Sequence, residues 1–447
     1  MSEDLLELLP RIITTDLVGS LVHTDGQAMA VAGCPAPVGA LVEIERQAGP
    51  PLRGEVVGFR NEHAIVHPLG QVTGVRRGSQ VRLVNTARYV RVGEALLGRV
   101  IGAEGNVLDR GPRPGCLART RLDRQAPEPV ERPRIQQPLG TGIRAIDAML
   151  TCGRGQRIGI FSGSGVGKSV TLGMMARYTA ADVNVIGLVG ERGREVNEFL
   201  ERDLGPEGLA RSVVVVATSD QPALMRVQAA FTATAVAEYF RDRGNHVQLM
   251  MDSLTRVALA QREIGLAAGE TPTTRGYPPS VFGMLPRLAE RAGLTAKGSI
   301  TGFYNVLVEG DDTNEPISDT VRGLLDGHVM LSRELAAQGH YPAIDVLSSI
   351  SRLMPAVTST QHQHAVQTIR RLLAVHQDHQ DLISIGAYRP GSNPLVDTAI
   401  HIKPKIDQFL CQGMDESTAI EVTVKNFIAL AERCQQSKPA VQNTADS

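Results

Sequence analysis

The chain has 447 residues, with 46 lysines and arginines against 47 aspartates and glutamates, so its formal net charge is −1. This length predicts more than one domain, and the balanced charge excludes long-range attraction to nucleic acid or anionic lipid. No run of eighteen apolar residues appears, so the sequence predicts no membrane-spanning helix. The five cysteines are scattered with no C-x-x-C pair, which predicts reduced thiols in a cytoplasmic protein, with neither a zinc site nor a disulfide frame.

The first fifteen residues form a segment of their own. Leu5, Leu8, Leu9 and Ile12 recur at helical spacing, which predicts a short amphipathic helix. Two interpretations of its apolar face stay open, because the face can pack on the domain that follows or bind another protein. We assign residues 1–15 as a segment that docks a regulatory partner.

Residues 16–90 show short alternating apolar runs broken by glycine and proline. Ala40–Ile44, Gly54–Phe59 and Gln80–Leu83 are three of these runs. Closely spaced strands with turn residues between them predict a small β-barrel.

Strands and helices alternate after a proline- and arginine-rich connector at Gln125–Gln137. Apolar runs at 157–161, 183–189, 212–217 and 247–251 are separated by stretches of helical period. This alternation predicts a parallel sheet covered by helices, so the expected fold class is α/β. We expect the barrel at 16–90, the domain built on this sheet at 91–355 and a helical domain at 356–447.

The strongest motif follows the apolar run that begins at Arg157. Its glycines let backbone N–H groups converge on phosphate oxygens at the start of a helix. Lys168 would reach the β- and γ-phosphates of a nucleotide, and the Ser169 hydroxyl would hold Mg²⁺. The residues predicted to bind ATP here are Gly163, Ser164, Gly165, Val166, Gly167, Lys168, Ser169 and Val170. The strict pattern has glycine where Ser162 stands, and we expect this small residue to be tolerated.

Two further apolar strands end in acidic residues, as hydrolysis requires. Asp252 ends the run that begins at Val247 and is predicted to support the metal, although it could also cap the helix that follows. Glu191 follows the run that begins at Val185 and is predicted to polarise the attacking water. Arg192 beside it would pair with phosphate or hold the carboxylate, and the alternative is a surface Glu–Arg pair.

Several longer motifs resemble the rotary ATPase superfamily. They are Gly190–Glu195, Asp252–Arg256 and Arg275–Ser280. Within that superfamily the chain is similar to the flagellar and type III secretion export ATPases, and the stretches Ala260–Leu266 and Val308–Pro316 resemble the flagellar branch.

The resemblance implies a RecA-like central domain and further site residues. Tyr341 lies in the segment whose tyrosine stacks on adenine, although a core tyrosine would need similar surroundings. Arg352 matches the arginine finger that is supplied to the neighbouring subunit, and Phe409 would complete the adenine pocket. Asn393 replaces an aspartate that is usual in the family.

The function that this resemblance implies is Mg²⁺-dependent ATP hydrolysis by a homo-hexameric ring that energises flagellar-type protein export. The expected partners are a regulatory or stator protein at the N-terminus, a central stalk protein, export-gate membrane proteins and chaperone-bound export substrates. The expected location is cytoplasmic, at the inner face of the membrane. The alternatives are an injectisome ATPase, the catalytic subunit of a rotary ATP synthase, or a scaffold that binds nucleotide without turnover.

Two other interpretations are less favoured. A nucleic-acid translocase needs stacking aromatic residues and a basic groove in its barrel, and the first 90 residues hold only Phe59 and Tyr89, so no nucleic-acid partner is expected. His362 and His364 lie two residues apart and would diverge on a helix, so we predict a solvated helix face instead of a metal site.

Overall fold

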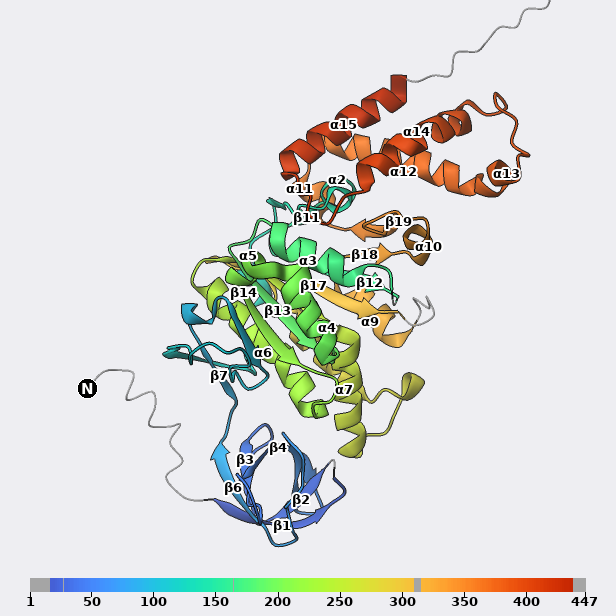
Figure 1. Cartoon of the computed structure of the whole chain (residues 1–447). Helices are drawn as coiled ribbons and strands as arrows, with labels where there is room; N and C mark the ends of the chain where they lie inside the picture. The colour runs from blue at the N-terminus through green and yellow to red at the C-terminus, as the bar shows by residue number, and fades with distance from the viewer. Residues whose placement is uncertain (1–16, 27, 164, 309–314, 437–447) are drawn as a thin grey trace, which may run out of the picture.

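The computed structural model describes residues 17–26, 28–163, 165–308 and 315–436. Three bodies follow one another along the molecule: a small barrel, a central domain built on a large sheet, and a group of helices at the C-terminal end (Figure 1). This arrangement confirms the predicted fold class.

The barrel is closed, and its neighbouring strands run in the order β1-β2-β5-β4-β3-β6. Side chains alternate between its interior and its surface, so that Val42, Ile44, Val81 and Leu83 are buried while the residues between them are not. The strands are β1 (Val18–Thr24), β2 (Met29–Ala32), β3 (Leu41–Ile44), β4 (Leu52–Arg60), β5 (His63–Pro68) and β6 (Gln80–Asn85).

The central sheet has the strand order β19-β18-β12-β17-β15-β13-β14-β8, with the short β16 paired to β17. Its strands are parallel except β16 and β19, which run antiparallel to their neighbours. The strands are β8 (Arg99–Gly102), β12 (Arg157–Ser162), β13 (Val183–Val189), β14 (Ser212–Ala217), β15 (His246–Asp252), β16 (Gly293–Leu294), β17 (Ser299–Leu307), β18 (Gly327–Leu331) and β19 (Ile344–Ser351).

Helices cover both faces of this sheet, as its continuous apolar strands require. One face packs against α6 (Ala223–Asp242), α7 (Leu254–Ala267), α8 (Pro279–Ala289) and α9 (Pro316–Leu324). The other face packs against α2 (Arg144–Met149), α3 (Lys168–Tyr178) and the π-helical turn Phe199–Leu204. The remaining α-helices and strands of this domain are α4 (Gly193–Glu198), α5 (Gly205–Ala210), α10 (Arg333–Ala337), the ribbon β7 (Tyr89–Val92) with β9 (Ala118–Arg121), and the pair β10 (Pro138–Leu139) with β11 (Cys152–Gly153).

The C-terminal body consists of α11 (Met354–Val357), α12 (Thr360–Asp378), α13 (Gln380–Ser384), α14 (Pro394–Leu410) and α15 (Ile420–Gln436). Apolar residues of α12, α14 and α15 join the same core as α2 and α3, so this body is continuous with the phosphate-binding side of the sheet.

The prediction of a solvated face for His362 is wrong. Its side chain is buried, and its ring Nε2 lies 2.7 Å from the carbonyl oxygen of Ala148 in α2. The ring is accommodated because that carbonyl satisfies its polar atom. Within the described residues no group of three or more histidines, cysteines or acids could hold a metal ion. None of the described helices has the length and apolar character needed to cross a membrane.

Candidate functional site

The phosphate-binding turn lies at the carboxyl end of β12, where α3 begins. Gly165 and Gly167 have φ values of +80° and +82°, a left-handed conformation that favours glycine. Gly167 is the residue that immediately precedes α3, so the free N–H groups of the first turn of α3 point toward the cavity beside it.

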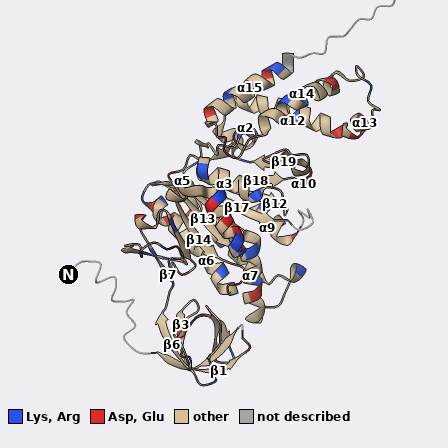
Figure 2. Ribbon diagram, viewed as in Figure 1, with Lys and Arg blue, Asp and Glu red and all other residues tan. Residues whose placement is uncertain are grey.

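That cavity has a volume of about 680 Å³. Of the predicted ATP-binding residues, Gly163, Gly165, Gly167, Lys168, Ser169 and Val170 line it, whereas Val166 is buried in the core beneath the turn. Ser164 lies outside the described residues. Acidic and basic residues meet in the middle of the central domain, between α3 and α7 (Figure 2).

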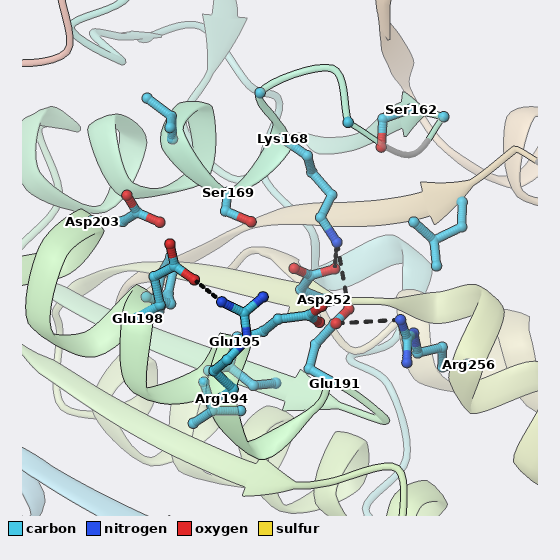
Figure 3. A pocket seen from close by; sticks show the side chains of 18 of the residues that line it. Ser162, Lys168, Ser169, Glu191, Arg194, Glu195, Glu198, Asp203, Asp252 and Arg256 are labelled. Carbon is cyan, nitrogen blue, oxygen red and sulfur yellow. Dashed lines mark hydrogen bonds and ion pairs between the residues drawn. The ribbon is translucent and has the colours of Figure 1, made fainter.

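Lys168, Glu191 and Asp252 meet in this cavity (Figure 3). The Lys168 Nζ lies 2.9 Å from Asp252 Oδ1 and 3.4 Å from Glu191 Oε1. Three different strands bring them together, because β12, β13 and β15 are parallel and their carboxyl ends share one edge of the sheet. The geometry places one ammonium between two carboxylates where the phosphates of a nucleotide would enter.

The electrostatics of the three groups reflect this arrangement. Burial lowers the pKa of Lys168, but the carboxylates of Asp252 and Glu191 outweigh it, so the net shift is upward. Burial and the nearby Asp252 carboxylate raise the pKa of Glu191 to about 7, against the opposing effects of Lys168 and Arg256. A carboxylate whose pKa lies near neutrality suits a group that accepts a proton from water.

Two residues that the sequence analysis did not single out contact the carboxylates of Glu191 and Asp252. Arg256, in the first turn of α7, places its Nη2 3.3 Å from Glu191 Oε2 and donates a hydrogen bond to the carbonyl of Gly190. Asn305, on β17, donates from Nδ2 to Asp252 Oδ1 at 2.5 Å. Asn305 is buried in a strand that also contains the buried polar residues Ser299 and Thr301, so its polarity did not set it apart in the sequence.

The side chain of Arg192 does not contact Glu191 in the structure. Its side chain is exposed and pairs loosely with Glu195, with 3.7 Å between Nη1 and Oε1. The contact that we expected from Arg192 is made by Arg256 in this structure.

Tyr341 lies beside the phosphate-binding turn and is partly exposed. A Cβ added to Gly167 would lie 3.2 Å from the ring carbon Cε1 of Tyr341, so the ring approaches the last glycine of the turn. Phe409 is half-buried near the end of α14, where its ring packs against Phe427 with centroids 5.5 Å apart. It does not line the cavity.

Arg352 lies near the amino-terminal end of β12, whereas its own phosphate-binding turn follows the carboxyl-terminal end of that strand. It follows β19, and its N–H donates to the carbonyl of Asp326, whose carboxylate accepts from the N–H of Arg157 at the start of β12. The turn begins at the other end of this six-residue strand, about 17 Å away at about 3.3 Å per residue. That distance exceeds the reach of an arginine side chain, so Arg352 does not contact its own cavity.

Three sequence profiles match the chain in the order of its three bodies. Residues 29–85 match the β-barrel domain of the ATP synthase alpha/beta family, residues 142–351 match the nucleotide-binding domain of that family, and residues 358–429 match the T3SS EscN ATPase C-terminal domain.

Relatives match over nearly the whole chain. The flagellum-specific ATP synthase of Bacillus subtilis (strain 168) is 52% identical over 414 residues, which are 93% of each protein. The type 3 secretion system ATPase of Xanthomonas euvesicatoria is 50% identical over 408 residues, covering 91% of this chain and 92% of that protein. The assembled ATPase EscN of the enteropathogenic E. coli type III secretion system superimposes with a TM-score of 0.88 at 43% identity, over 92% of this chain and 100% of that chain.

Proposed function

The chain belongs to the family of flagellum-specific ATP synthases and type 3 secretion ATPases, and we propose that it hydrolyses ATP to energise the export of flagellar-type proteins. The observation that carries this proposal is the meeting of Lys168, Glu191 and Asp252 at the end of a phosphate-binding turn. The backbone of Gly163, Gly165 and Gly167 would hold the phosphates. Lys168 would move away from the two carboxylates and neutralise negative charge on the phosphates. Glu191 would then accept a proton from the attacking water, while Arg256 holds its carboxylate in place.

A magnesium ion fits the oxygen donors of this cavity. The Ser169 hydroxyl and the Asp252 carboxylate line the same cavity, and such oxygens are the ligands that Mg²⁺ prefers. Bound there with ATP, Mg²⁺ would neutralise charge on the β- and γ-phosphates.

In a homo-hexameric ring, Arg352 would contact the nucleotide bound to the neighbouring subunit. Because Arg352 cannot reach its own cavity, a head-to-tail neighbour is the place where it can act as an arginine finger. EscN, which this chain resembles, is known in an assembled form and in complex with its central stalk EscO, where the TM-score to this chain is 0.86. We propose the same two properties for this chain: it would assemble into a ring of six subunits, and the ring would bind a central stalk protein.

The other proposed partners follow from an export role at the inner face of the membrane. They are export-gate membrane proteins, chaperone-bound substrates, and a regulatory or stator protein that binds residues 1–15, which lie outside the described residues.

The rate of hydrolysis should fall as the pH decreases through about 7. The Glu191 carboxyl accepts a proton only in its ionised form, and its pKa is raised to about 7, so kcat/KM should rise with pH up to that value and then level off. Arg256 opposes the upward shift, and Arg256→Gln should therefore move this limb to higher pH. Initial rates of phosphate release between about pH 5.5 and about pH 9 would measure both effects. A flat profile in the wild type would remove Glu191 from the role of base.

The export role can be tested by expressing this chain in bacterial strains that lack their own related ATPase. A Bacillus subtilis strain that lacks its flagellum-specific ATP synthase should regain swimming on soft agar when it expresses this chain, because the two proteins share 52% identity. The Lys168→Ala variant, at the same expression level, should not restore swimming. If the chain instead restored secretion to a Xanthomonas euvesicatoria strain without its type 3 secretion ATPase, and no swimming, the injectisome alternative would replace the flagellar one.

A further inference from the structure

Arg144 links the first helix of the central domain to the end of α14. It is the first residue of α2, and its side chain reaches one of the last carbonyls of α14 and the carbonyl of the residue that follows the helix, neither of which has a partner within the helix. Nε donates to the carbonyl of Phe409 at 2.9 Å, and Nη2 donates to the carbonyl of Cys411. A guanidinium at this position also suits the negative end of the helix dipole.

Gln412 forms a second link at the same place and is buried. Its side-chain Nε2 donates to the carbonyls of Gly142 and Glu416, both at 2.7 Å, while its Oε1 accepts from the N–H of Arg144 at 2.8 Å. Its own N–H donates to the carbonyl of Tyr341, also at 2.8 Å. The side-chain amide of Gln412 therefore links residues 142–144 to the turn after α14, and the backbone N–H of the same residue links that turn to Tyr341.

We propose that Arg144 and Gln412 position the base of the bound nucleotide, although neither lines the phosphate cavity. Together they form one hydrogen-bonded unit, the Arg144–Gln412 brace, that fixes the main chain of Tyr341 and of Phe409. The inference rests on the proposed assignment of these two aromatic residues to the adenine pocket. Any displacement of α14 relative to α2 would reach Tyr341 through Gln412, so the position of the C-terminal helices would control how the base is held.

Gln412→Glu tests the brace with little change in volume. The new side chain still accepts from Arg144, but it cannot donate to Gly142 and Glu416, so the main chain of residue 412, which donates to Tyr341, loses this anchor. We expect the KM for ATP to rise about tenfold, which is the scale of losing one base–aromatic contact. The inhibition constant of inorganic tripolyphosphate, which has phosphates and no base, should change by less than about twofold, and kcat by less than about threefold.

Arg144→Lys provides a second variant in case the first folds poorly. It keeps the charge but loses the forked contact with the two carbonyls, and it should show the same separation between ATP and tripolyphosphate. Arg177→Lys is the matched control, because Arg177 donates to the carbonyl of Met414 in the same turn without contacting the partners of Tyr341 or Phe409. Its ATP and tripolyphosphate constants should both stay at wild-type values.

The result that would overturn the brace is an equal rise in the KM for ATP and in the inhibition constant for tripolyphosphate, since this would indicate a general scaffold. Unchanged values for both ligands in Gln412→Glu and Arg144→Lys would also overturn it. A wild-type chain that binds neither ligand would instead refute the proposed nucleotide site, so the two failures are distinguishable.

Discussion

Glu191→Gln is expected to bind ATP with nearly wild-type affinity and to lose about two or more orders of magnitude in kcat. The amide has the size of the carboxylate and leaves Lys168, Asp252 and the glycine-rich turn in place. It cannot accept a proton from water, and that step matters mostly in the transition state. Phosphate release gives kcat, and titration with a fluorescent ATP analogue gives the affinity.

Glu198→Gln serves as the control for this variant. Glu198 is also a carboxylate of the same cavity, but it pairs with Arg194 and Arg202 and has no contact with Lys168. We expect its kcat to stay within about threefold of the wild type. A Glu191→Gln variant with weakened affinity and intact kcat would identify Glu191 as a structural acid.

The acidic pair could be predicted because both residues follow apolar strands. The sequence identifies such strands by their composition, and parallel strands present their carboxyl ends at one edge of a sheet. The rule therefore predicts that Glu191 and Asp252 lie at the same edge of the sheet as Lys168. How close the three groups come depends on the strand order, and the order β12-β17-β15-β13 brings them together.

The partners of the acidic pair depend on contacts between segments that are distant in sequence. Arg192 is adjacent to Glu191 in sequence, but it is the residue that immediately precedes α4, and its side chain points into solvent. Arg256 belongs to a different helix, and its position beside Glu191 depends on the neighbouring order of β13 and β15. Asn305 requires knowledge that β17 lies between β12 and β15. No single-sequence pattern reports these neighbours.

His362 illustrates the same limit on a helix surface. Its spacing from His364 argued against a shared metal, because residues two apart diverge on a helix. Which face of α12 is buried depends on α2, which lies more than two hundred residues earlier in the chain. The helical period alone therefore could not separate a buried histidine from a solvated one.

Arg352→Ala is expected to bind ATP through its own phosphate-binding turn and to hydrolyse it about three to five orders of magnitude more slowly. In a head-to-tail ring, the arginine of one subunit would stabilise negative charge on the γ-phosphate held by its neighbour. The specific activity of the wild type should also rise with protein concentration, because isolated subunits lack this arginine.

The decisive experiment mixes two inactive variants. Lys168→Ala retains Arg352 but has no working phosphate site, whereas Arg352→Ala retains the site but offers no arginine to its neighbour. Where the two stand side by side in the correct order, one competent site forms, so the mixture should regain activity that neither variant has alone. Sizing by light scattering must show that the mixed rings have formed, and mixing two batches of Lys168→Ala gives the matched negative control. If mixed rings form and stay as inactive as their components, Arg352 acts within its own subunit, which the six-residue length of β12 argues against.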